Sequence, residues 1–437
     1  MLDLKIINGK CYIEGALHNK DLGILNGIIH EIGDLNQIES KEIYDAKGEI
    51  VLPGLIDTQV HFREPGSIDA EDLHTGSRAA IVGGITSVFE MPNTNPPTTN
   101  LLEFQNKINL AKNRMYCNHA FYFGATPDNG KELSELKGLN GCCGVKLFAG
   151  SSTGTLLVHK EEDIEKVFQS TSKIVAVHSE DEDILNLRKK LIVKGDVNSH
   201  PVWRNEECAI SSTRKIVKIA KRLNKRAHIL HVTTKEEVDF LSQNKGNITF
   251  EITPQHLTLY APECYEKLGS YAQMNPPIRQ KIHYDRLWYA VKNSYNDTIG
   301  SDHAPHLKEN KNKTYPETPS GMPGVQTIVP VMLNHVNSGK LTINQLVKFL
   351  CENPVNIFGI KNKGKIQKGF DADITIINLL KEIEIKNNNI ESKCKWSPFN
   401  GYIFKGSPTC TVINGQIKMQ NGKIIGKPNG VPLSFIK

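Results

Sequence analysis

The sequence predicts an α/β protein, a (β/α)₈ TIM-type barrel with a small β-sandwich domain formed from both chain termini. Between residues 55 and 365, eight short apolar runs alternate with segments of helical spacing. Both chain ends instead carry β-rich runs broken by Asn-Gly turns. We therefore expect residues 1–54 and 366–437 to form the β-sandwich and residues 55–365 to form the barrel.

The β-rich runs of the first end are 2–9 and 23–33, and those of the second end are 371–379, 409–418 and 421–426. The eight expected barrel strands span 55–62, 85–92, 119–126, 144–150, 174–180, 227–233, 248–257 and 298–305. Intervening segments such as 71–84, 101–113, 211–224 and 235–243 repeat apolar residues at helical intervals. Eight strands that alternate with helices favour a closed barrel over an open sheet.

The composition is that of an ordinary folded protein and excludes several other classes. The chain has 437 residues, 39% of them hydrophobic, with 53 Lys+Arg against 47 Asp+Glu. It contains no dense basic stripe mixed with aromatics, so nucleic-acid binding is not indicated. Nine scattered cysteines favour reduced thiols. No signal-peptide pattern or membrane-length apolar run occurs, and we expect a cytoplasmic protein with no membrane partner.

Polar side chains stand at the ends of most of the expected barrel strands. These residues are His61, Asn93, Lys146, His178, His231, His256 and Asp302. Barrel enzymes place their chemistry at this end, and His and Asp are typical ligands of zinc or a similar divalent ion. One histidine alone would be an ordinary hydrogen-bonded side chain, but the whole set predicts a site. Lys146 fits beside cations only if it is modified to an anion.

Eight motifs in this order resemble the cyclic amidohydrolases, and dihydroorotases most closely, with hydantoinases and allantoinases as more distant relatives. The motifs are LPGLIDTQVHFREPG, FEMPNTNPPTT, GVKLFAGSSTG, AVHSEDE, HILHVTT, TPQHLTL, QMNPPIR and GSDHAPH. The resemblance covers nearly the whole chain. It implies reversible opening of dihydroorotate by water to N-carbamoyl-aspartate, a step of pyrimidine synthesis, at a metal centre in the barrel.

The resemblance also implies roles for single residues. Lys146 would be carboxylated and would bridge two zinc or similar ions. His178 and His231 would bind one ion, and His61 and Asp302 the other. Asp302 would also be the catalytic base. The substrate would contact Arg63, Asn93, Asn275, His306 and Gly321. A homodimer is common among such proteins.

One position departs from the family pattern. The first strand usually carries His-x-His, whereas this chain has Gln59-Val60-His61, and a glutamine amide is a much weaker zinc ligand than imidazole. One hypothesis is an enzyme with one tightly held ion, or with a second ion held weakly. Another is an inactive scaffold subunit for aspartate transcarbamoylase. A third is an enzyme for hydantoin or allantoin. Arg63 with Asn93 argues against it, because a carboxylated ring needs an anion site and a hydantoin does not.

Residues 306–324 are polar, rich in proline and without periodicity. They are interpreted as a loop over the site, either a mobile lid or a plain connector. Lys308, Lys311 and Lys313 are interpreted as a solvated face of this loop.

Overall fold

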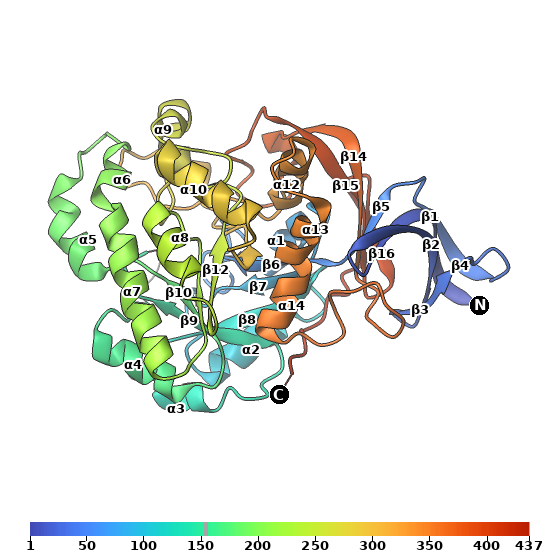
Figure 1. Cartoon of the computed structure of the whole chain (residues 1–437), viewed down its shortest axis with the longest axis horizontal. Helices are drawn as coiled ribbons and strands as arrows, with labels where there is room; N and C mark the ends of the chain where they lie inside the picture. Colours follow the sequence, from blue (N-terminus) through green and yellow to red (C-terminus); the bar gives the residue numbers. More distant parts are fainter. Residues whose placement is uncertain (153–155, 437) are drawn as a thin grey trace.

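The computed structural model describes residues 1–152 and 156–436, so Thr153 and Gly154 of the GVKLFAGSSTG motif and Lys437 lie outside the described residues. Its central feature is an eight-stranded parallel sheet in the order β6 to β13 (Figure 1). The strands are β6 (Leu55–Val60), β7 (Ile85–Glu90), β8 (Asn118–Gly124), β9 (Cys142–Phe148), β10 (Val175–His178), β11 (Ala227–Ile229), β12 (Ile248–Ile252) and β13 (Thr298–Ile299).

The sheet closes on itself where its first and last strands end. A parallel bridge joins Val60 to His303, and the His61 amide donates to the His303 carbonyl at 2.7 Å. All eight expected strands are therefore present, and the predicted barrel is confirmed. The strands are buried on both faces, as in parallel sheets covered by helices.

Helices surround this barrel on the left of Figure 1. They are α1 (Leu73–Val82), α2 (Leu101–Ala111), α3 (Gly130–Ser134), α4 (Glu161–Ser170), α5 (Glu182–Arg188), α6 (Ser199–Trp203), α7 (Glu206–Arg222), α8 (Lys235–Ser242), α9 (Glu263–Leu268), α10 (Lys281–Lys292), α11 (Lys308–Lys311), α12 (Ile328–Asn337), α13 (Ile343–Val347) and α14 (Asn353–Phe358). The local sequence determines where several of these helices begin. Asp72 caps α1 and Thr234 caps α8, each in a reciprocal capping box.

A second, nine-stranded sheet joins the two chain ends, on the right of Figure 1. Its strands are β1 (Leu2–Ile13), β2 (Ala16–Leu25), β3 (Ile28–Gly33), β4 (Ser40–Asp45), β5 (Ile50–Pro53), β14 (Ile374–Glu384), β15 (Ile403–Ile413), β16 (Gln416–Gln420) and β17 (Lys423–Ile424). β5 pairs antiparallel with β14, with Leu52 opposite Thr375. This pairing assembles the terminal sheet that the sequence predicts.

The Asn-Gly turns of this sheet have the backbone that their sequence favours. Asn26 and Gly27, and likewise Asn414 and Gly415, all have positive φ angles, as tight hairpin turns require. All nine cysteines are buried and free, in agreement with the expected reduced thiols. Within the described part of the chain, none of the helices has the length and apolar character needed to cross a bilayer.

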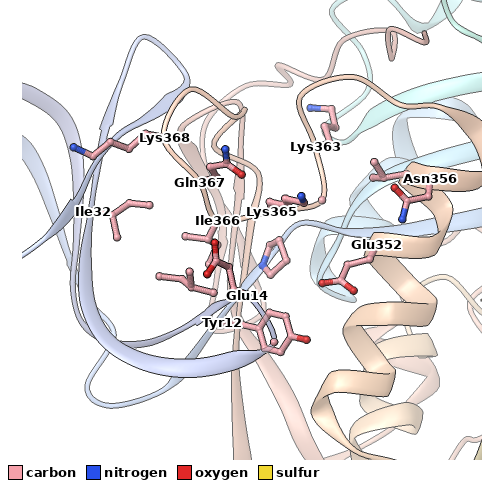
Figure 2. Close-up of a pocket in the computed structure, with 15 residues that line it drawn as sticks. Tyr12, Glu14, Ile32, Glu352, Asn356, Lys363, Lys365, Ile366, Gln367 and Lys368 are labelled. Atoms are coloured by element: carbon pink, nitrogen blue, oxygen red, sulfur yellow. The ribbon is translucent and has the colours of Figure 1, made fainter.

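A cavity of about 770 Å³ lies where the terminal sheet meets the barrel (Figure 2). Its lining includes Tyr12 and Glu14 of the terminal sheet, Glu352 and Asn356 next to the barrel, and the segment 363–368. Lys363 forms ion pairs with Asp371 and Asp373. None of the sequence-predicted site residues lines this cavity.

Candidate active site at the carboxyl ends of the barrel strands

A much smaller cavity, of about 20 Å³, lies at the carboxyl ends of the barrel strands. Nine of the ten predicted site residues line it: His61, Arg63, Asn93, Lys146, His178, His231, Asn275, Asp302 and Gly321. The tenth, His306, lies beside it, with its Nε2 3.3 Å from Arg63 Nη2 and 3.0 Å from the Ser320 carbonyl oxygen. We take this cavity as the candidate site despite its size, because titratable and amide groups from many strands converge there.

One half of the cavity is a pair of buried imidazoles. His178 Nδ1 lies 3.1 Å from His231 Nε2. On its other side, His178 Nε2 lies 2.9 Å from Glu180 Oε2, and a carboxylate can only accept a hydrogen bond there. Burial lowers the pKa of both histidines. Neutral His178 therefore carries its proton on Nε2, which leaves the Nδ1 lone pair directed at His231.

Glu180 is itself held by Arg204, whose side chain is also buried. The Arg204 Nε donates to both carboxylate oxygens at 3.1 Å, and Nη2 donates to the Ser151 carbonyl at 2.7 Å. Arg204 and His178 lower the pKa of Glu180 against the effect of burial. Sequence reasoning missed Glu180 and Arg204. The only available signal was the acidic residue two positions after a strand-end histidine.

Lys146 also lines the cavity. Its side chain is buried, with Nζ 4.5 Å from the centroid of the Phe148 ring, and it makes no hydrogen bond to another described residue. Burial lowers the pKa of Lys146 and raises that of Asp302, while the attraction between the two groups opposes both shifts. Lys146 is thus closer to a neutral amine than an exposed lysine would be.

The other half of the cavity contains Gln59, His61 and Asp302. Gln59 Nε2 donates to Asp302 Oδ1 at 2.8 Å, and His61 Nε2 lies 3.3 Å from the same oxygen. His61 Nδ1 lies 2.8 Å from Asn93 Oδ1. Gln59 Oε1 is buried with no hydrogen-bond partner among the described residues. The amide that replaces the usual histidine therefore acts as a donor to the carboxylate.

Three of the site residues have strained backbones. Arg63, His231 and Asp302 have φ angles of 59°, 36° and 44°, a region that residues other than glycine rarely adopt. Gly321 has φ +144°, and a Cβ there would lie 2.5 Å from the Ala304 carbonyl oxygen. Such strain is retained where the surrounding structure fixes a side chain for function.

The remaining predicted residues form the polar wall of the cavity. Arg63 Nε donates to the Pro305 carbonyl at 3.2 Å, and its other guanidinium nitrogens make no hydrogen bond to the backbone of the described residues. Asn275 Oδ1 lies 3.0 Å from His200 Nε2, and its Nδ2 lies 3.5 Å from Ser152 Oγ. Sequence reasoning also missed His200.

The remaining strand-end histidine, His256, contacts the Pro276 carbonyl at 3.2 Å and does not line the cavity.

The interpretation of three loop lysines as a solvated face is wrong for one of them. Lys308 and Lys313 are exposed, but Lys311 is fully buried. Its Nζ donates to three backbone carbonyls, so the solvent-facing pattern of its neighbours does not extend to it.

Comparison with known proteins places the chain in a family. A model of the amidohydrolase family matches residues 50–418. A dihydroorotase of Methanosarcina acetivorans is 34% identical over 98% of this chain and 94% of its own length, and one of Thermococcus kodakarensis is 32% identical over 98% and 97%. The structure of an L-hydantoinase (dihydropyrimidinase) from Arthrobacter aurescens has a TM-score of 0.95 at 28% identity and covers 99% of this chain and 100% of its own. The predicted resemblance is thereby confirmed, and the chain belongs to the amidohydrolase family.

Proposed function

We propose that the protein is a dihydroorotase, which catalyses the reversible conversion of (S)-dihydroorotate and water to N-carbamoyl-L-aspartate in pyrimidine synthesis. The relatives named dihydroorotase and the hydantoinase structures support the prediction of a cyclic amide hydrolase. The observation that carries the substrate assignment is the presence of Arg63 in the same cavity as Asp302 and the two imidazoles. Dihydroorotate has a carboxylate that an arginine can bind through two hydrogen bonds.

In this proposal the chain's own residues bind the substrate and move protons. Arg63 holds the carboxylate, and Asn93 and Asn275 hold the carboxylate and the ring amide, with His306 and the Gly321 backbone alongside. Asp302 takes a proton from the attacking water and later delivers it to the leaving nitrogen. Because burial raises the pKa of Asp302, this carboxyl group is suited to exchange a proton near neutral pH.

The residues of the cavity also fit a divalent metal, for which we propose zinc. In the described part of the chain, no three His, Cys, Asp or Glu side chains gather in a metal-binding group. The His178 Nδ1 lone pair, however, faces His231, and His231 Nδ1 has no partner among the described residues. A neutral Lys146 amine can form an N–C bond with carbon dioxide and release one proton, and the resulting carbamate would supply the missing anionic ligand. A bound ion would polarise the substrate carbonyl and acidify water.

We propose that one ion is held tightly by His178, His231 and carboxylated Lys146. The second position, with His61 and Asp302, would hold an ion weakly, because Gln59 turns its NH₂ group toward Asp302. The inactive scaffold for aspartate transcarbamoylase stays an alternative. Against it, the ten predicted site residues gather in and beside one cavity.

A hydantoinase or allantoinase activity is the second candidate, which the hydantoinase structures favour. The test compares wild type and Arg63→Met on dihydroorotate and on a neutral cyclic ureide. We expect the variant to lose about 10²-fold in kcat/KM for dihydroorotate, in the range of a lost buried hydrogen-bonded charge contact, and far less for the neutral ring. An equal loss for both substrates would contradict the anion site.

The assembly and location of the protein are further proposals. We propose a homodimer in the cytoplasm, with aspartate transcarbamoylase as a partner to test. Size-exclusion chromatography with light scattering, run on the protein alone and with added transcarbamoylase, distinguishes a monomer, a homodimer and a complex by mass.

A further inference from the structure

Lys311 is a buried cation that the proposed mechanism does not use. Its side chain is fully buried at the end of α11, in the loop that follows His306. Its Nζ donates to the carbonyls of Pro319 at 2.9 Å, Gln273 at 3.2 Å and Gly321 at 3.3 Å. No carboxylate of the described residues pairs with it, and burial lowers its pKa to about 7. Burying an ammonium without a counter-charge is costly.

The three carbonyls belong to two segments that carry proposed substrate contacts. Gln273 lies two residues before Asn275, and Pro319 lies two residues before Gly321. The Gly321 amide also donates to the Gln273 carbonyl at 2.9 Å. An ammonium group has three donors, so the Lys311 side chain meets its full hydrogen-bonding capacity by bringing these two segments together.

The side chain of Gln273 also joins these two segments. Its Nε2 donates to the Thr318 carbonyl at 3.0 Å and lies 3.0 Å from Ser320 Oγ. On the other side, Lys311 Nζ lies 5.8 Å from the centroid of the Trp396 ring, whose Nε1 donates to the His306 carbonyl at 2.7 Å. Lys311 therefore lies between the backbones that carry three of the proposed substrate contacts, Asn275, His306 and Gly321.

We propose that Lys311 is a positioning residue for the substrate site, which holds the segment ending at Gly321 against the segment carrying Asn275. This inference rests on the proposed function for the identity of the substrate. It goes beyond that function because Lys311 does not line the cavity and its Nζ donates only to the backbone of segments that do. Small displacements of substrate-positioning groups have large kinetic effects.

The test uses Lys311→Met in the full-length, zinc-loaded protein, since methionine fills similar space without donors. We expect KM for dihydroorotate to rise about 10-fold or more, with kcat within about threefold of wild type and bound metal unchanged. We also expect faster amide hydrogen exchange at residues 273–275 and 318–321. A purely structural lysine would lower thermal stability without moving KM.

Lys5→Met is the matched control. Lys5 is also largely buried, and its Nζ donates to the Leu35 and Ile38 carbonyls at 3.1 and 3.0 Å, in the terminal sheet. Its removal should cost stability but leave KM and exchange at the two site segments unchanged. An equal KM rise in both variants, or unchanged KM and exchange in Lys311→Met, would overturn the inference.

A second variant covers the case in which Lys311→Met does not fold. Gln273→Leu removes the side-chain donors to Thr318 and Ser320 and should raise KM in the same direction; an unchanged KM would count against the inference. If wild type fails to open dihydroorotate, the proposed function fails. Amide hydrogen exchange at residues 273–275 and 318–321 can be compared between wild type and variant without substrate, and this comparison then still decides whether Lys311 joins the two segments.

Discussion

The two halves of the cavity are built in different ways. In the half with His178 and His231, the buried Glu180 carboxylate lies 2.9 Å from His178 Nε2, and the His178 Nδ1 lone pair faces His231 Nε2 at 3.1 Å. In the half with Gln59, an amide already donates to Asp302. In the first half an imidazole nitrogen faces another imidazole nitrogen, and both are atoms that can bind a cation. In the second half a protein amide donates to one carboxylate oxygen. The difference indicates that one substitution, Gln59 for the usual histidine, would make the two proposed metal positions unequal.

The largest expected effect comes from removing a histidine from the first half of the cavity. His178→Ala removes one of the three ligands that we propose for the tightly held ion. We expect bound zinc to fall more than about 10-fold and turnover to fall with it. Elemental analysis of the purified protein measures the metal. His335→Ala is the control, because this buried histidine contacts Thr258 away from the cavity. Unchanged metal content in His178→Ala would contradict the ligand assignment.

The next largest effect is a loss of turnover, and it comes from changing Asp302 in the second half of the cavity. Asp302→Ala should lower kcat by about 10²- to 10⁴-fold, the usual contribution of a general acid–base group. Binding of N-carbamoyl-L-aspartate, measured by calorimetry, should persist because Arg63 and the two asparagines remain. A variant with near-normal turnover would place the base elsewhere.

Glu180→Gln tests whether the carboxylate behind His178 organises the first half. Loss of such a partner typically weakens metal affinity by about 10- to 100-fold. Competition with a zinc-binding dye measures this directly. Glu182→Gln is the matched control, since this nearby carboxylate instead accepts hydrogen bonds from Ser151. Equal zinc affinity in wild type and Glu180→Gln would show that the ring orientation does not depend on Glu180.

The smallest expected effect comes from giving the second half of the cavity a histidine at position 59, so that both halves contain two imidazoles. Gln59→His replaces the donor to Asp302 with an imidazole, so bound zinc should rise from about one toward about two ions per chain, in the two-ion arrangement of such sites. Turnover should change by less than about 10-fold. A metal stoichiometry that stays the same would show that position 59 is not a ligand position.

The sequence was sufficient for the barrel because its signals are local. Each strand is a short apolar run, and polar residues such as His61, His178 and Asp302 mark the strand ends that the barrel brings together. The same reasoning found nine residues of the cavity. It also identified Gln59 as the departure, although not the hydrogen bond that Gln59 donates to a residue 243 positions away.

What the sequence could not indicate depends on long-range packing. Arg204 reaches Glu180 from a different segment, and nothing in its neighbourhood marks it as buried. Lys311 stands between polar residues and has the sequence context of a surface lysine, yet backbone carbonyls up to 38 residues away surround it. The left-handed backbones of Arg63 and His231 likewise have no signature in residue type.

The most direct test of the account is ring opening of dihydroorotate by the purified protein, followed by the loss of its ultraviolet absorbance. The protein is assayed as purified, after chelation, and after zinc is restored. We expect turnover that disappears on chelation and returns with zinc. A folded, zinc-loaded protein without turnover on dihydroorotate would contradict the proposed dihydroorotase activity and favour the scaffold role.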